Sequence, residues 1–188
     1  MLKNFSTREL IFLTLIGAFM FLADWFIAAP ITAATGISGT GGLVSTFFWA
    51  LIAIFGGLVV RKFGSFSLMH LIYGFLTILA PITLLPGIFK IILFGLMGLL
   101  TDIIIYAYKY KKFGYYMGMI IGHIFFFIGA YLLYTWLGIP TTSQVKGAYI
   151  MVFIIPLLTL FMCGLGVFAG YRIFLKIKNR RIIKNIIS

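Results

Sequence analysis

Apolar residues in this sequence form runs of about twenty, separated by short stretches rich in glycine, proline and basic residues. About 20 helical residues cross a hydrocarbon core about 30 Å thick, because each adds about 1.5 Å. The runs are too long for barrel strands and lack their alternation, so helices are expected. The pattern predicts an all-α polytopic membrane protein, a six-transmembrane-helix bundle forming a single transmembrane domain over 1–188. The expected spans are 9–29, 42–60, 66–83, 88–108, 115–137 and 148–174.

The composition agrees with a protein that lies mostly in lipid. Hydrophobic residues make up 63% of the chain and charged residues 10%, whereas a soluble domain carries roughly 25% charged residues. The net charge of +12 comes from short clusters between apolar runs, so it argues for topology signals rather than a nucleic-acid-binding face. The one cysteine, Cys163, lies in an apolar run and is expected to be a small buried hydrophobe.

Lysine and arginine fall almost entirely on one side of the predicted spans. Of the 15, only Lys90 and Lys146 lie on the other side. The positive-inside rule therefore places both termini in the cytoplasm, for a multi-pass protein of the cell (inner or plasma) membrane. With this orientation, segment 30–41 is an external loop that begins at Pro30. It is uncharged and built mainly of Gly, Thr, Ser and Ala, so it either closes over a cavity or serves as a passive linker.

Three acidic residues need an explanation, because a charge at mid-membrane costs about 2.5–3.5 kcal/mol on insertion scales. Glu9 lies at the expected start of the first helix, where the helix dipole favours an acid. Asp24 and Lys90 both lie in the outer half of the bundle. They form either a buried structural ion pair or the charged wall of an externally open ligand pocket. Asp102 and His70 lie in the inner half, where they are expected to pair with each other or with the cytoplasmic basic cluster.

Aromatic residues near the outer side are candidates for ligand stacking or for packing. Trp25 and Trp49 are placed to stack on a flat ring. Tyr134 and Trp136 are also explained by the aromatic belt at the membrane interface. Gln144 belongs to a polar loop that could close over a ligand.

The residues needed for autonomous catalysis are absent from the sequence. It contains no HExxH, GxSxG or P-loop motif. Two histidines, one cysteine and three scattered acids do not supply a metal site, which needs three or four ligands. We therefore expect no enzyme, no catalytic residue, no metal and no cofactor, and any energy for transport must come from another chain or from a gradient.

Two local motifs, with the overall size and topology, resemble the substrate-binding S-components of energy-coupling-factor (ECF) importers. The turn Arg61-Lys62-Phe63-Gly64 is similar to the Arg-Lys-x-Gly turn of the hydroxymethylpyrimidine/thiamine-related members. The stretch from Gly95 to Tyr106 resembles a glycine-rich segment with an acidic residue that these families share. The sequence departs from the pattern in two places: Thr14-x3-Ala18 fits the small-residue spacing of the first helix only in part, and His70 stands where pyrimidine-type members carry an acid.

The resemblance implies a protein that captures a small vitamin or vitamin precursor outside the cell for ATP-driven uptake. It implies a membrane-embedded coupling protein and two cytoplasmic ATPase subunits as partners. The coupling protein would dock on Thr14, Gly17 and Ala18. The alternatives are an accessory or structural membrane subunit, or a small channel or lipid-handling protein, with no ligand of its own. The implied substrate-binding residues are Asp24, Trp25, Trp49, Lys90, Tyr134, Trp136 and Gln144.

Overall fold

The computed structural model of the chain is all-α. It describes residues 5–35, 40–78, 87–138, 155–180, 183 and 186. In the described part, five helices or helical stretches are long and apolar enough to cross a membrane. A sixth apolar helix, α4, is described over 14 residues. The prediction of a polytopic helical membrane bundle is confirmed at this level.

Apart from the first span, the predicted spans match the observed helices to within a few residues wherever both can be compared. The span 66–83 is described only as far as residue 78, and the span 148–174 only from residue 155. The elements are α1 (Thr7–Ala23), η1 (Asp24–Ala28), α2 (Ala29–Thr35), α3 (Thr40–Val60), α4 (Ser65–Ile78), α5 (Gly87–Ala107), α6 (Lys112–Trp136) and α7 (Ile155–Ile177).

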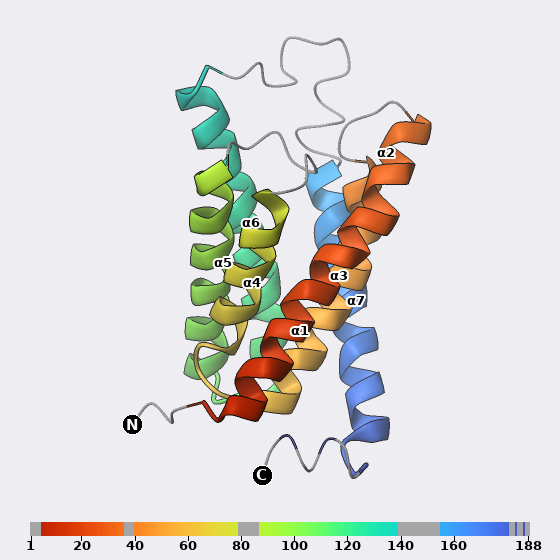
Figure 1. The fold of residues 1–188 in the computed structure, drawn as a ribbon, viewed down its shortest axis with the longest axis vertical. Coiled ribbons are helices and arrows are strands. Elements are labelled where there is room, and N and C mark those ends of the chain that lie inside the picture. The colour runs from red at the N-terminus through yellow and green to blue at the C-terminus, as the bar shows by residue number, and fades with distance from the viewer. Residues whose placement is uncertain are drawn as a thin grey trace.

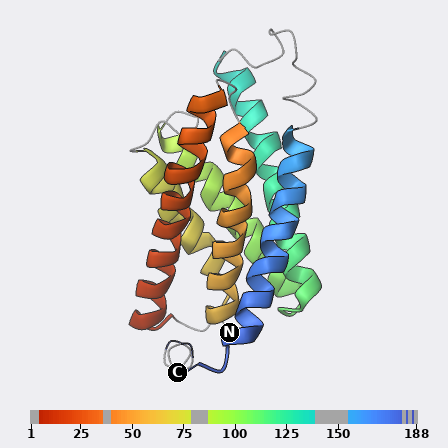
Figure 2. The same ribbon diagram turned by 90° about the vertical axis from the view of Figure 1, so that its right-hand side faces the viewer.

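The helices pack in a closed ring. Around it, α1 contacts α3, α3 contacts α7, α7 contacts α6, α6 contacts α5, α5 contacts α4, and α4 returns to α1. Figures 1 and 2 show these helices standing side by side, with the start of α1 and the end of α7 at the same end of the bundle. Side chains that point into the ring therefore meet residues from several helices.

The expectation that the first helix ends at Pro30 is wrong. The helix continues through Pro30, so Thr7–Thr35 form one 29-residue span, which crosses the bundle obliquely (Figure 1). The proline ring clashes with the carbonyl four residues earlier, at Phe26. That residue lies in the π-helical turn η1, whose wider spacing relieves such a clash. Most of the expected loop 30–41 is therefore helical, and residues 36–39 lie outside the described part.

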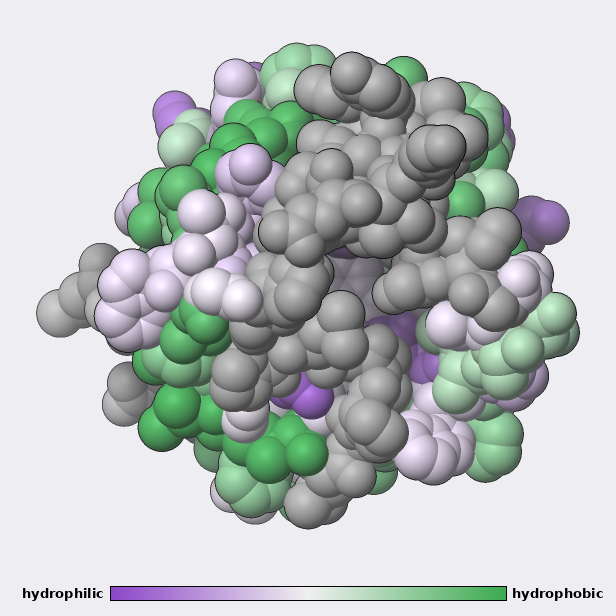
Figure 3. Space-filling view, turned by 90° about the horizontal axis from the view of Figure 1, so that it is seen from above, coloured by the Kyte–Doolittle hydropathy of each residue, from purple (hydrophilic) through white to green (hydrophobic). Residues whose placement is uncertain are grey.

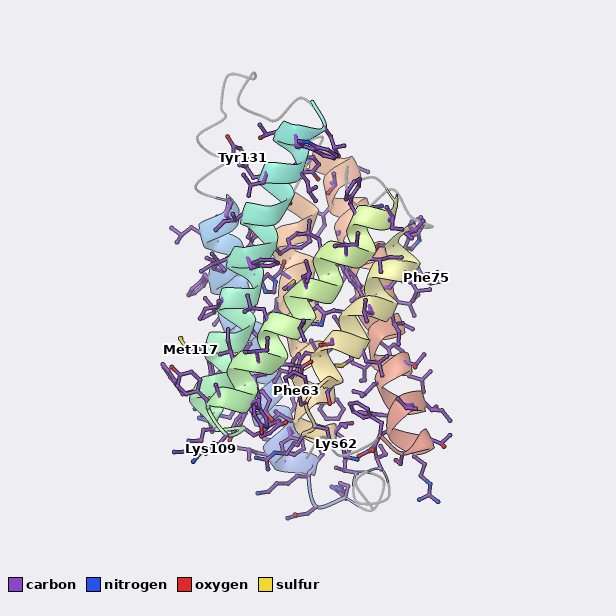
Figure 4. The ribbon with its side chains drawn as sticks, turned by 90° about the vertical axis from the view of Figure 1, so that its left-hand side faces the viewer. Lys62, Phe63, Phe75, Lys109, Met117 and Tyr131 are labelled. Carbon is purple, nitrogen blue, oxygen red and sulfur yellow. The ribbon has the colours of Figure 1, made fainter. Side chains whose placement is uncertain are left out.

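One end of the bundle collects most of the basic residues, and we call it the basic end. It contains the two tight turns that follow α3 and α5. Lys62 and Lys109 lie there, whereas Tyr131 lies toward the opposite end (Figure 4). Glu9 begins α1 at the basic end. Its carboxylate accepts a hydrogen bond from the backbone N–H of Ser6 in a capping box and forms an ion pair with Lys62 at 2.6 Å. The structural role expected for Glu9 is confirmed.

Asp102 does not pair with His70, which was one of the two pairings that the sequence allowed. Asp102 instead caps α4: its carboxylate accepts hydrogen bonds from the backbone N–H groups of Phe66 and Ser67 at 3.2 and 2.7 Å and from the Ser67 hydroxyl at 2.7 Å. These groups belong to the first turn of α4, where N–H groups lack helical partners and the dipole favours a negative charge. Asp102 therefore ties α5 to the start of α4.

Glycines allow close backbone contact between α3 and α7. A Cβ atom built on Gly166 would lie 2.3 Å from the carbonyl oxygen of Phe47, and one built on Gly170 would lie 2.7 Å from that of Leu51. Small residues at such positions let helices approach closely in a membrane, where apolar burial adds little. The Gly166-x3-Gly170 spacing therefore places both glycines against the backbone of α3.

Gly166→Ala should lower the thermal unfolding midpoint of the detergent-solubilised protein. The added methyl group cannot be relieved by a side-chain rotation because it meets backbone, and overpacking of this kind costs about 1–3 kcal/mol. Gly164→Ala, on the same helix, is the matched control, because its Cβ meets nothing within 4 Å. We expect it to leave the midpoint unchanged or raise it, since alanine favours helix. Equal effects of the two substitutions would contradict this account of α3–α7 packing.

Candidate functional site

Asp24 lies inside the bundle, away from the basic end. It belongs to the π-helical turn η1 and is 8% exposed. Its carboxylate accepts a hydrogen bond from the hydroxyl of Tyr73 on α4 and interacts with the hydroxyl of Ser45 on α3. Hydrogen bonds to a charged group contribute about 1.5–3 kcal/mol each, which offsets the cost of placing an acid in the membrane. A carboxylate offers about four lone-pair sites, so these two partners leave acceptor capacity.

Lys90 lies on α5 near the same end and is 4% exposed. Its ammonium group donates a hydrogen bond to the backbone carbonyl of Thr77 on α4 at 2.8 Å. Thr77 follows Tyr73 by four residues, which corresponds to about 6 Å along the helix axis. Asp24 and Lys90 are therefore attached to neighbouring turns of α4, one through each of these residues.

Asp24 and Lys90 do not form the ion pair that the sequence allowed. Within the described ranges, the one ion pair joins Glu9 and Lys62. A buried acid and a buried base thus lie near one end of the ring without neutralising each other directly.

Tyr73 belongs to a set of aromatic side chains that contact one another inside the helical bundle. The Tyr73 ring packs edge-on against Phe94 of α5, with centroids 4.7 Å apart, and Phe94 stacks on Phe126 of α6 at 4.6 Å. Trp49 of α3 contacts Tyr73 at 6.1 Å. Four helices therefore supply one continuous aromatic wall inside the ring.

Trp49 also lies between the two histidines of the chain. Its ring makes T-shaped contacts with His70 of α4 and His123 of α6, each with centroids 4.8 Å apart. Nδ1 of His123 lies 3.0 Å from the carbonyl oxygen of Met119 and 3.5 Å from the sulfur of Cys163 on α7. Cys163 is fully buried, as expected.

The predicted substrate-binding residues fall into three groups. Asp24, Trp49 and Lys90 are buried within the ring. Trp25 and Trp136 are 41% and 74% exposed, beside Phe21 and Phe89 respectively. This exposure suits the interfacial alternative for Trp136 and gives Trp25 a similar environment.

The other two predicted substrate-binding residues are less well placed. Tyr134 is intermediate in exposure. Gln144 lies outside the described residues. The structure therefore brings three of the seven predicted residues together inside the ring.

The three residues predicted for partner docking also differ in their burial. Gly17 is buried against α4, where a Cβ would lie 2.8 Å from the carbonyl oxygen of Met69. Thr14 is exposed and Ala18 is partly exposed. Large apolar side chains stand beside them, including Leu15 and Phe19 at 52% and 55% exposure. Thr14 and Ala18 are therefore small side chains flanked by larger ones on the outer face of α1, and we call these two positions the notch.

Sequence reasoning missed Ser45, Tyr73 and Thr77. Each carries a hydroxyl inside a transmembrane helix, and each is 3% exposed or less. The spacing of Tyr73 and Thr77 was a usable signal, because residues four apart on a helix lie on the same face. Ser45 carried no comparable signal, since serine in a membrane helix often bonds to its own backbone.

Viewed from the end opposite the basic end, the molecule shows small hydrophilic patches near the middle of the face, and both hydrophobic and hydrophilic surface lies around them (Figure 3). In the described ranges, no group of three or more His, Cys, Asp or Glu residues is placed to hold a metal ion. Comparison of the chain with protein-family models, with curated proteins and with solved structures gives no match. The arrangement of these residues is therefore the basis for any statement about function.

Proposed function

We propose that this chain is the substrate-capture subunit of an energy-coupling-factor importer and binds a small vitamin or vitamin precursor. Asp24 and Lys90 contact the polar parts of the substrate, and Trp49 with its aromatic neighbours contacts a flat ring. The chain has no catalytic step of its own. Transport energy comes from two cytoplasmic ATPase subunits through a membrane-embedded coupling protein.

The observation that carries this proposal is the buried acid and base near one end of a closed helical ring. A protein that only filled space in a larger complex has no use for Asp24 and Lys90 at a cost of about 2.5–3.5 kcal/mol each. A direct ion pair would have explained both residues as structural, but Asp24 bonds to Tyr73 and Lys90 to Thr77. A ligand that meets both groups is the explanation that we propose.

The basic end supports an orientation for the proposed function. Positive residues next to membrane spans favour the cytoplasm, so the end with Lys62 and Lys109 faces inward and Asp24 lies toward the outside. In this orientation the substrate enters from the external medium. The coupling protein approaches the notch at Thr14 and Ala18 on the lipid-facing side of α1 and tilts the loaded bundle toward the cytoplasm.

Native mass spectrometry of the full chain, released from detergent after purification from cells grown in rich medium, tests the proposal. We expect the protein with one small molecule of a few hundred daltons attached, and loss of that mass on gentle activation. An accessory subunit predicts bare protein that is stable only in a large assembly. A channel predicts bare protein with ion conductance in planar bilayers. Either of these results would refute substrate capture.

A further inference from the structure

Three buried side-chain polar atoms have no hydrogen-bond partner within the described part of the chain: Nε1 of Trp49, Nε2 of His70 and the hydroxyl of Tyr115. The first two lie on rings that contact each other. Trp49 is 5% exposed and His70 is fully buried. Leaving a buried polar atom without a partner costs about 1–3 kcal/mol. Two such atoms on rings in direct contact are therefore a strong local signal for a polar ligand.

The chemistry of these two atoms is complementary. The Trp49 indole N–H can only donate a hydrogen bond. Nδ1 of His70 lies 2.6 Å from the carbonyl oxygen of Phe66, which can only accept, so Nδ1 carries the proton. In the neutral imidazole, Nε2 then carries a lone pair and accepts. Trp49 and His70 thus present one hydrogen-bond donor and one acceptor on neighbouring rings.

These atoms are continuous with the site of the proposed function. Trp49 contacts Tyr73, and Tyr73 donates to Asp24. Tyr73 therefore links Asp24 to the contacting rings of Trp49 and His70. The surrounding rings, Phe94 and Phe126 among them, favour a flat group there.

A metal ion fits these two atoms less well than an organic ligand does. An indole N–H is not a ligand for a cation, and the described residues hold no cluster of three or more His, Cys, Asp or Glu. Two histidines from α4 and α6 fall short of the three or four ligands that a zinc site needs. An organic group with both a donor and an acceptor satisfies both atoms.

We infer that Trp49 and His70 form an inner subsite that selects substrates carrying a neutral, planar nitrogen heterocycle with an N–H donor and an acceptor on one edge. The acceptor on the ligand receives the Trp49 N–H, and the ligand N–H donates to His70 Nε2. His123, which contacts Met119 and Cys163, also packs edge-on against Trp49. This inference rests on the proposed function and adds a substrate class to it.

The test uses 2-pyridone as the probe, because its lactam edge carries an N–H beside a carbonyl. N-methyl-2-pyridone keeps the ring and the carbonyl and lacks the N–H. The full-length Trp25→Phe/Trp136→Phe protein leaves Trp49 as the one tryptophan of the chain, so its fluorescence reports on this site. We expect a saturable change with 2-pyridone and about tenfold weaker binding of the methylated probe, equivalent to about 1.4 kcal/mol.

Two variants assign the effect to the two atoms, with binding measured by equilibrium dialysis. His70→Phe keeps a ring and removes the acceptor, so it should abolish the preference between the probes. Trp49→Phe removes the donor and should weaken both probes about equally. Thermal unfolding of each variant checks that the bundle is intact, and Trp25→Phe alone serves as the exposed control.

The outcomes separate this inference from the proposed function. Equal affinity for both probes, an unchanged preference in His70→Phe, or no binding of 2-pyridone would overturn the inner subsite. Substrate capture would survive if the molecule retained in native mass spectrometry still bound both variants normally. Conversely, selective 2-pyridone binding by a chain that retains no natural molecule would support the subsite and refute capture.

Discussion

Replacing Thr14 and Ala18 together with tryptophan should abolish substrate uptake by cells while leaving substrate binding to the purified chain within twofold of wild type. Both residues lie on the exposed side of α1, in a notch between larger apolar side chains. Helices in membranes associate closely where small side chains meet. Two indoles would fill the notch and hold a partner helix away. The measurement is accumulation of the molecule identified by native mass spectrometry, in cells that express the complete importer.

The control for this variant is Leu15→Trp, which adds an indole to a neighbouring exposed position that is already bulky. It should leave uptake close to normal, because it does not fill the notch. Gly17 is unsuitable for the test, since α4 occupies its surface and a substitution there would disturb the fold. Normal uptake by the double variant would remove the outer face of α1 as the docking surface.

The bundle could be predicted because its dominant forces act locally along the sequence. Span length follows from membrane thickness, and the turn at Gly64 follows from the positive φ that glycine adopts readily. The positive φ angles at Lys109 and Tyr110 could not be predicted in this way, because neither residue is glycine. The error at Pro30 has a physical cause. Proline was read as a break, but a π-helical turn accommodates it, and such turns leave no composition signal.

The site was harder to predict because it depends on rotation and contact between helices. Asp24 and Lys90 were recognised as costly residues, which burial confirms. Their partners were not recognised, since Tyr73 and Ser45 become relevant only when α4 and α3 turn those residues toward Asp24. Exposed and interior aromatics look alike in sequence, which explains why Trp25 and Trp136 were grouped with Trp49.

Asp102 illustrates the same limit at the basic end. Its position in the sequence predicted an acid inside the membrane that requires a polar or charged partner, and His70 was one candidate for that partner. The actual partners are backbone N–H groups of α4. The first backbone N–H groups of a helix are hydrogen-bond donors, and a count of charged residues in the sequence does not reveal them.

The most direct measurement for the whole account is the affinity of Asp24→Asn for the retained substrate, by equilibrium dialysis on the purified chain. Asparagine keeps the shape and can still accept from the Tyr73 hydroxyl, so the bundle should unfold at a similar temperature. Removing one charge from a buried polar contact costs about 2–5 kcal/mol, so affinity should fall about thirtyfold or more.

Glu9→Gln is the matched control, since it makes the same acid-to-amide change at a buried residue of the basic end. It should lower stability through loss of the Lys62 ion pair and leave substrate affinity unchanged. The account predicts a large loss of affinity in Asp24→Asn and none in Glu9→Gln. Undiminished binding by a folded Asp24→Asn protein would show that Asp24 serves the fold alone and would contradict a ligand site at this end of the ring.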